Sequence, residues 1–108
     1  MKNIEKEEEE ALGKSDWSIS FVSENFKLGF KQVIIDDHIE FFAELENLTA
    51  NNYKSVWFLL KGQYKNNKEN FTERVSFRNL NPHSKKISDV YIDEELLNVQ
   101  FEFLKFSE

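Results

Sequence analysis

The sequence predicts one small all-β domain, a sandwich of seven to eight short antiparallel strands. The chain has 108 residues, of which 40% are apolar and 15% are aromatic, with eleven Phe. One β-sandwich needs roughly 100 residues, and this aromatic content can offset the entropy that a folding chain loses. Apolar and polar residues alternate along most of the chain, and turn-forming residues interrupt the alternation about every ten to fifteen residues. This combination favours strands over helices.

The first sixteen residues do not share this pattern. They contain the run Glu7–Glu10 and few apolar residues, and their net charge of −3 is half of the −6 that the whole chain carries. Such a charge block is usually solvated. We therefore expect residues 1–16 to be a flexible acidic tail and residues 17–108 to form the β-sandwich domain. The alternative is an acidic arm that docks on a basic partner.

Four strands are expected in the first half of the domain: Trp17–Val22, Phe26–Ile35, Ile39–Leu45 and Val56–Leu60. Between the second and third, Asp36-Asp37-His38 predicts a tight turn, because Asp tolerates the backbone conformations that turns require. The fourth strand is apolar on both faces. It is therefore expected to lie centrally in its sheet, or to have something packed over its outer side.

Three more strands are expected in the second half: Phe71–Phe77, Ile87–Ile92 and Leu97–Phe103. Tyr64–Glu69 reads as a hairpin loop in which Asn66 and Asn67 supply the positions of positive φ. Asn79–Ser84 is a corner that holds the only Pro, and Asp93–Glu95 is a turn. In the last strand the inner face is predicted to be Leu97, Val99, Phe101 and Phe103.

Three features follow one another between Ile39 and Ile92. An alternating strand ends in Asn47, a hydrophobic strand leads to an aromatic-polar hairpin at Tyr64, and Leu80-Asn81-Pro82 forms a corner before the chain returns to the core. This order resembles the immunoglobulin-like modules that include the bacterial FxLYD domains and the LEA14-type domains. The resemblance implies an immunoglobulin or fibronectin III-like sandwich with an accessory or binding role and no shared active site.

Composition excludes several classes of function. A net charge of −6 argues against nucleic acid as a partner, because affinity for phosphate backbones comes largely from Lys and Arg. The chain has no Cys, which removes disulfides, thiolate catalysis and Cys-based zinc sites. No stretch approaches the ~20 apolar residues of a membrane span, and the N-terminus has no hydrophobic signal core. If Met1 is the native start, we expect a cytoplasmic protein.

The residues that carry chemistry form no recognised catalytic or metal-binding pattern. His38 and His83 both fall in expected turns without a second ligand at metal-binding spacing. The carboxylate clusters Asp36-Asp37 and Asp93-Glu94-Glu95 also lie in turns, where carboxylates are normally solvated, whereas a catalytic pair needs one carboxyl in an apolar pocket. We therefore expect no enzyme activity, no cofactor, no metal and no small-molecule ligand. The alternative is a small enzyme with a polar site at one pole, if the two His turns meet.

The remaining candidates are surface side chains. Trp57, Leu59 and Phe42 fall on the outward faces of their strands, so either both faces are buried there or an apolar patch awaits a partner or a second subunit. Lys61 and Lys65 lie on one hairpin, either as protection of an edge strand or as a basic patch for an acidic partner.

Three hypotheses follow. The first is a noncatalytic binding or accessory module that engages protein, or a second copy of itself, through a sheet edge or through the face around Trp57. The second is a stress-related structural sandwich that protects other proteins without a specific ligand. The third is the small enzyme with a site built around His38 or His83.

Overall fold

The computed structural model describes residues 17–108 and contains seven strands. They are β1 (Ser18–Val22), β2 (Phe26–Ile35), β3 (His38–Asn47), β4 (Tyr53–Tyr64), β5 (Asn70–Leu80), β6 (Lys85–Val90) and β7 (Leu96–Ser107). The all-β prediction is confirmed, and every expected strand is present. The predicted flexible acidic tail, residues 1–16, lies outside the described residues.

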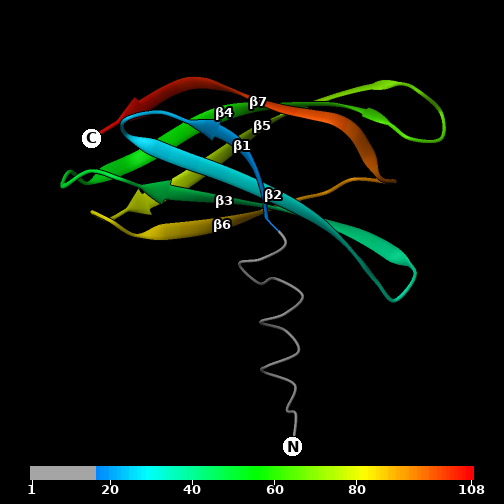
Figure 1. Ribbon diagram of the computed structural model, residues 1–108, viewed down its shortest axis with the longest axis horizontal. Coiled ribbons are helices and arrows are strands. Elements are labelled where there is room, and N and C mark those ends of the chain that lie inside the picture. Colours follow the sequence, from blue (N-terminus) through cyan, green and yellow to red (C-terminus); the bar gives the residue numbers. More distant parts are fainter. Residues whose placement is uncertain (1–16) are drawn as a thin grey trace, which may run out of the picture.

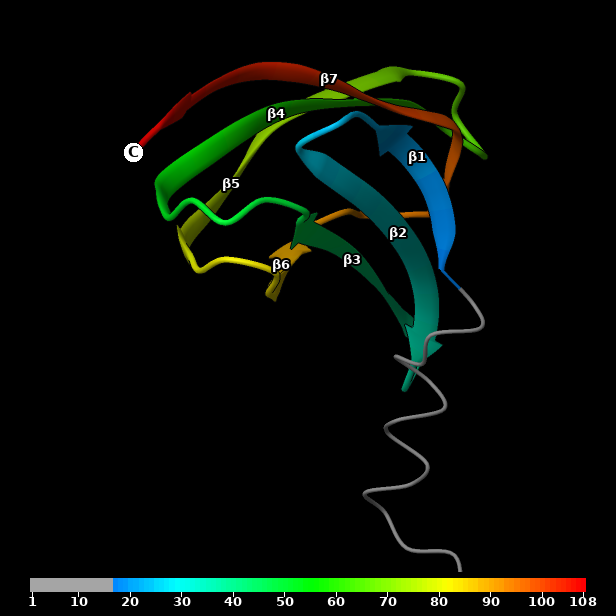
Figure 2. The same ribbon diagram turned by 60° about the vertical axis from the view of Figure 1, so that its left-hand side comes forward.

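The strands form two antiparallel sheets that pack face to face (Figures 1 and 2). One sheet has the order β1-β2-β3-β6 and the other the order β5-β4-β7. The strand that is apolar on both faces, β4, is the centre of the three-stranded sheet, as its sequence predicts. The predicted two-layer β-sandwich is therefore present.

The turn between β2 and β3 follows from its sequence. Asp36 and Asp37 have φ values of 48° and 72°, and Ile35 pairs directly with His38. Two successive positive φ values define the type I′ turn, whose twist matches that of the strands it joins. This turn fixes the register of the β2–β3 hairpin, which runs without a shift from Ile35 back to Phe26.

The core is a cluster of aromatic and aliphatic side chains between the sheets, with Phe58 of β4 at its centre. Its ring is fully buried and lies 5.2 Å from the ring of Phe21 and 5.6 Å from that of Phe103, both in edge-to-face geometry. Edge-to-face pairs add about 0.5–1.5 kcal/mol each to the burial of the rings. Phe21 comes from β1, so this short strand closes the core on the side of β7.

Two details of the sequence prediction were wrong. The inner face of β7 begins at Leu96, which is 2% exposed, rather than at Leu97. Asn98 has φ 55° and lies at a register shift between β7 and β4, and this bulge reverses the alternation. In the β4–β5 turn the residue with positive φ is Lys68, at 65°, not Asn66 or Asn67.

Asn47 holds the end of β3 against two neighbouring loops. Its side chain is fully buried, and its Nδ2 donates to the carbonyls of Asn51 at 2.7 Å and Asn81 at 2.9 Å. Its Oδ1 accepts from the backbone N–H of Thr49 at 2.9 Å and from the Thr49 hydroxyl at 2.8 Å. A buried amide must be paired in this way to offset its desolvation. Asn47 therefore ties the strand to the corner that contains Pro82.

Candidate functional site

The outer face of the three-stranded sheet brings together aromatic, aliphatic and cationic side chains. On β4 the residues Val56, Phe58 and Leu60 are fully buried, so the residues between them point outward. The register of the two neighbouring strands places further side chains on the same face. We call this surface the Trp57 face; it consists of Ser55, Trp57, Leu59, Lys61, Thr72, Arg74, Ser76, Arg78, Gln100, Glu102 and Lys105.

Trp57 lies between two cations. It pairs with Ser76 of β5 and with Lys105 of β7. The Arg78 guanidinium carbon and the Lys105 ammonium nitrogen each lie 5.9 Å from the centre of the Trp57 ring. At this distance a cation is attracted by the quadrupole of the indole ring, and the contact is worth about 0.5–1 kcal/mol when it is exposed. The two cations hold the half-buried ring in place and leave their own charge at the surface.

The Trp57 face is basic on an acidic protein. It carries the cations Lys61, Arg74, Arg78 and Lys105 and a single carboxylate, Glu102. Its net charge is therefore +3, whereas the whole chain carries −6. The one ion pair within the face is Lys61 Nζ–Glu102 Oε1 at 3.0 Å. Such segregation of charge creates a local positive potential that attracts acidic groups.

The structure brings three of the five predicted binding residues together. Trp57, Leu59 and Lys61 follow one another along the outer side of β4, the central strand of the three-stranded sheet. Lys65 lies apart in the β4–β5 turn, where its Nζ is 3.4 Å from Oε1 of Glu95. Its charge is thus offset locally and does not extend the Trp57 face.

Phe42 lies on the opposite side of the sandwich. It belongs to β3, in the four-stranded sheet, and points away from the core between Lys31 of β2 and Asp89 of β6. Its side chain is nevertheless only 9% exposed. Phe42 and Trp57 therefore cannot form one patch, because the whole core lies between them.

Sequence reasoning missed the three cations Arg74, Arg78 and Lys105. Arg74 and Arg78 lie on β5 and Lys105 lies on β7, both distant from Trp57 in the sequence. The alternation of β5 puts Arg74, Ser76 and Arg78 on one side of that strand, which was a usable signal. The bulge in β7 that aligns Lys105 with Trp57 has no comparable signal in the sequence.

The two His turns do not meet. His38 starts β3, whereas His83 lies in the corner that contacts the end of β3, where the backbone N–H of Asn47 donates to Ser84. Ten residues of extended strand separate these ends by about 30 Å. His38 is exposed, and its Nε2 lies 2.7 Å from Oε2 of Glu40. This hydrogen bond raises the pKa of His38 above its ordinary value.

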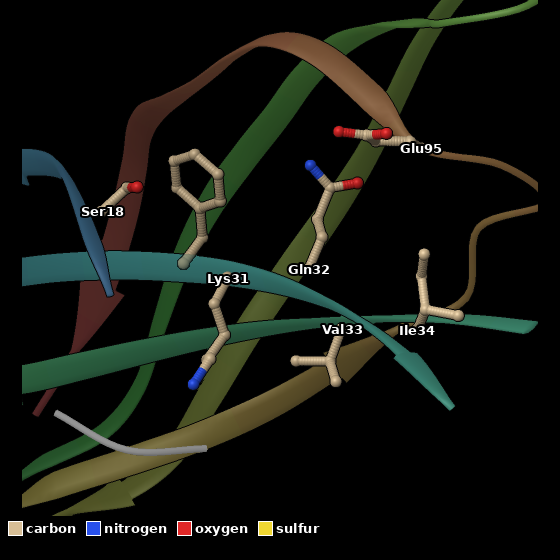
Figure 3. A pocket seen from close by; sticks show the side chains of 7 residues that line it. Ser18, Lys31, Gln32, Val33, Ile34 and Glu95 are labelled. Atoms are coloured by element: carbon tan, nitrogen blue, oxygen red, sulfur yellow. The ribbon is translucent and has the colours of Figure 1, made fainter. Parts of the chain in front are cut away.

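A hollow of about 560 Å³ lies beside the end of β2 (Figure 3). The Gln32 amide on its wall is already used, because it donates to the Leu96 carbonyl at 3.0 Å and accepts from the Leu96 N–H at 2.8 Å. Lys31 and Glu95 also line it, but Lys31 points to the opposite side of β2 from Gln32 (Figure 3). The hollow does not gather reactive groups at one point.

Within residues 17–108, no three His, Asp or Glu side chains are grouped as metal ligands would be. The same part of the chain has no helix long and apolar enough to cross a membrane. Comparison with known proteins found no matching family model, no matching curated protein and no matching solved structure.

Proposed function

We propose that this protein is a noncatalytic, immunoglobulin-like binding module that engages an acidic segment of a protein through the Trp57 face. The observation that carries the proposal is the net charge of +3 around a central Trp, on a chain of charge −6. Trp and Arg are the side chains most enriched at the energetic centres of protein interfaces. The surrounding cations would guide an acidic partner to this face and orient it.

The strand order supports the immunoglobulin-like assignment. Counted from β2, the first, second and fifth strands form one sheet as β2-β3-β6, and the third and sixth pair as β4-β7. Strands A, B and E, and strands C and F, are neighbours in the same way in immunoglobulin domains. In this numbering β1 is an added N-terminal strand. The hydrogen bond from Asn47 to the Asn81 carbonyl also joins two of the features on which the FxLYD-type resemblance rests.

The Trp57 face is a better binding surface than the edge formed by β7. The edge strand β7 is long, but its pairing with β4 has two register shifts. Bulges of this kind twist an edge and interrupt the regular row of backbone groups that an added strand needs. One of these shifts also lies within the Trp57 face, between Trp57 and Phe58, but the pairing of β4 with β5 beneath the face has no shift.

Protein fits this face better than nucleic acid does. Surfaces that bind single strands stack successive bases on several aromatic side chains within a strongly cationic groove. On the Trp57 face one aromatic ring is present, and Glu102 offsets one of the four cations. The carboxylates elsewhere on the chain would repel a phosphate backbone, because the net charge is −6.

The test is a titration of the ¹⁵N-labelled full chain with a synthetic Glu-rich peptide of sixteen residues, at low salt. We expect saturable shifts of the Trp57 indole N–H and of the amides around it, and roughly fivefold weaker binding of Trp57→Ser, since an interface Trp contributes 1 kcal/mol or more. The double variant Arg74→Gln/Arg78→Gln tests the charge without removing the ring. Trp17→Ser is the matched control and should bind as the native chain does.

Four results would overturn the proposal. They are shifts centred elsewhere, unchanged binding by the variants, equal binding of a Gln-rich peptide of the same length, or tighter binding of a single-stranded oligonucleotide. Sedimentation at several concentrations adds a separate measurement: self-association that Trp57→Ser abolishes, without peptide binding, would identify a second copy as the partner instead.

A further inference from the structure

Three of the four cations of the Trp57 face, Arg74, Arg78 and Lys105, form no ion pair with a carboxylate of residues 17–108. The ion pairs among residues 17–108 are His38–Glu40, Lys61–Glu102 and Lys65–Glu95. Arg74, Arg78 and Lys105 take part in none of these pairs, and all three are exposed. The positive charge of the Trp57 face is therefore concentrated on the β5 and β7 sides of the ring.

The complementary charge is present in the same chain. Residues 5–10 have the sequence Glu-Lys-Glu-Glu-Glu-Glu, with five carboxylates and one ammonium group. Residues 1–16 lie outside the described residues, so this comparison uses their sequence alone. Their net charge of −3 equals in magnitude the +3 of the Trp57 face.

We propose that the acidic segment Glu5–Glu10 docks on the Trp57 face of its own chain. The inference rests on the proposed function, because it uses the same face and the same chemistry. It goes further by naming the occupant of that face when no partner is bound. An external acidic partner must then displace this segment before it can bind.

The connection is long enough for docking within one chain. The segment joins the domain at Trp17, directly before β1. The first residue of β1, Ser18, pairs with Phe30 of β2, and the Phe30 ring lies 6.3 Å from that of Phe101 of β7. The path leads around the β7 edge to the outer face, a distance of roughly 20 Å for sheets about 10 Å apart. From Glu10 to Trp17 the chain can extend about 23–25 Å, and from Glu7 about 35 Å.

Attachment makes a weak contact effective. Because the connection is short, the effective concentration of the segment at the face is about 1 mM. If the segment alone bound with a Kd of about 0.5 mM, an external peptide would bind roughly threefold more weakly to the native chain than to one without the acidic charges. High salt should remove this difference, because exposed charge pairs are screened.

The absence of Cys from the sequence allows a clean measurement. In the full-length Ala11→Cys variant a nitroxide label is attached at the single thiol, and broadening of ¹⁵N resonances is recorded. We expect broadening of the Trp57 indole N–H and of the Leu59 and Ser76 amides, and its loss in 0.5 M salt. The matched control carries the same label with Glu5, Glu7, Glu8, Glu9 and Glu10 all replaced by Gln, and should show no local broadening.

Each outcome decides the proposal. Broadening that is spread evenly, lies elsewhere or persists in the Gln control overturns it. Broadening that appears only when labelled and ¹⁵N chains are separate molecules assigns the segment to a second copy and also overturns it. The Glu-rich peptide should bind the Gln variant roughly threefold more tightly than the native chain. If the Gln variant binds the peptide but the labelled Ala11→Cys chain shows no local broadening, this inference fails and the proposed function stands. If the Gln variant does not bind the peptide, the proposed function fails.

Discussion

Removal of the Asn47 amide should test how the domain holds its loops. The side chain makes four hydrogen bonds, of 2.7–2.9 Å, to Asn51, Thr49 and Asn81, and it is fully buried. Each buried partner that loses its bond costs about 1–3 kcal/mol, but loop partners can recover part of this from water. We expect Asn47→Ala to destabilise the fold by about 2–4 kcal/mol.

Asn47→Asp has almost the same shape and isolates the role of the donors. A carboxylate at this position would face the carbonyl oxygens of Asn51 and Asn81 instead of donating to them. The folded state should therefore raise the pKa of the new Asp above its unfolded value of about 3.9. A raised pKa means that the variant is closest to the native protein below pH 4 and loses stability as the pH rises through the folded pKa.

The assay is urea unfolding of both variants at pH 7 and at pH 4, followed by Trp fluorescence. Asn51→Ala is the matched control, because Asn51 is exposed and contributes its backbone carbonyl to Asn47. We expect this control to change stability by less than about 0.5 kcal/mol. The reasoning is refuted if Asn47→Ala is no worse than Asn51→Ala, or if Asn47→Asp shows no recovery at low pH.

Three further predictions concern the core and the surface. Gln32→Leu should lower the free energy of unfolding by about 2–3 kcal/mol, because it leaves the buried N–H and C=O of Leu96 without their partner. Phe58→Ala should cost about 3–5 kcal/mol, since a fully buried ring at the centre of the core is removed; urea unfolding measures both. In an NMR titration, Glu40→Gln should lower the pKa of His38, because the hydrogen bond to Glu40 raises it in the native protein. The raised pKa means that any stability from this charged pair is present below the unfolded pKa of His38 and is lost as the pH rises through the folded one.

Matched variants keep these predictions specific. Gln63→Leu loses one exposed hydrogen bond to Lys68 and should cost much less than Gln32→Leu. Phe106→Ala removes a ring that is 45% exposed and should cost less than Phe58→Ala. If the two variants of either pair lose the same free energy of unfolding, burial of the side chain does not determine the loss. If the pKa of His38 is the same in Glu40→Gln as in the native protein, Glu40 does not raise it.

Local sequence determined which residues form strands and where the chain turns. Alternation with period two depends only on neighbouring residues, so it marked the strands and the buried side of β4, including Phe58. The turn at Asp36 and Asp37 was also predictable, because both residues tolerate positive φ. Alternation also predicted Val99, Phe101 and Phe103 on the inner side of β7, but it failed at the start of the strand, where Leu96 is buried instead of Leu97. A bulge there moves one residue out of the pairing without a distinctive sequence.

The tertiary structure alone decided which side chains share a surface. Trp57, Leu59 and Phe42 all follow outward alternation, yet strand order places Phe42 on the other sheet. Arg78 and Lys105 reach the Trp57 ring from strands on either side of β4, and their alignment depends on long-range register. The sequence by itself therefore determined an all-β domain with an outward Trp, because strand periodicity is local. Only the pairing of distant strands made that Trp the centre of a basic face.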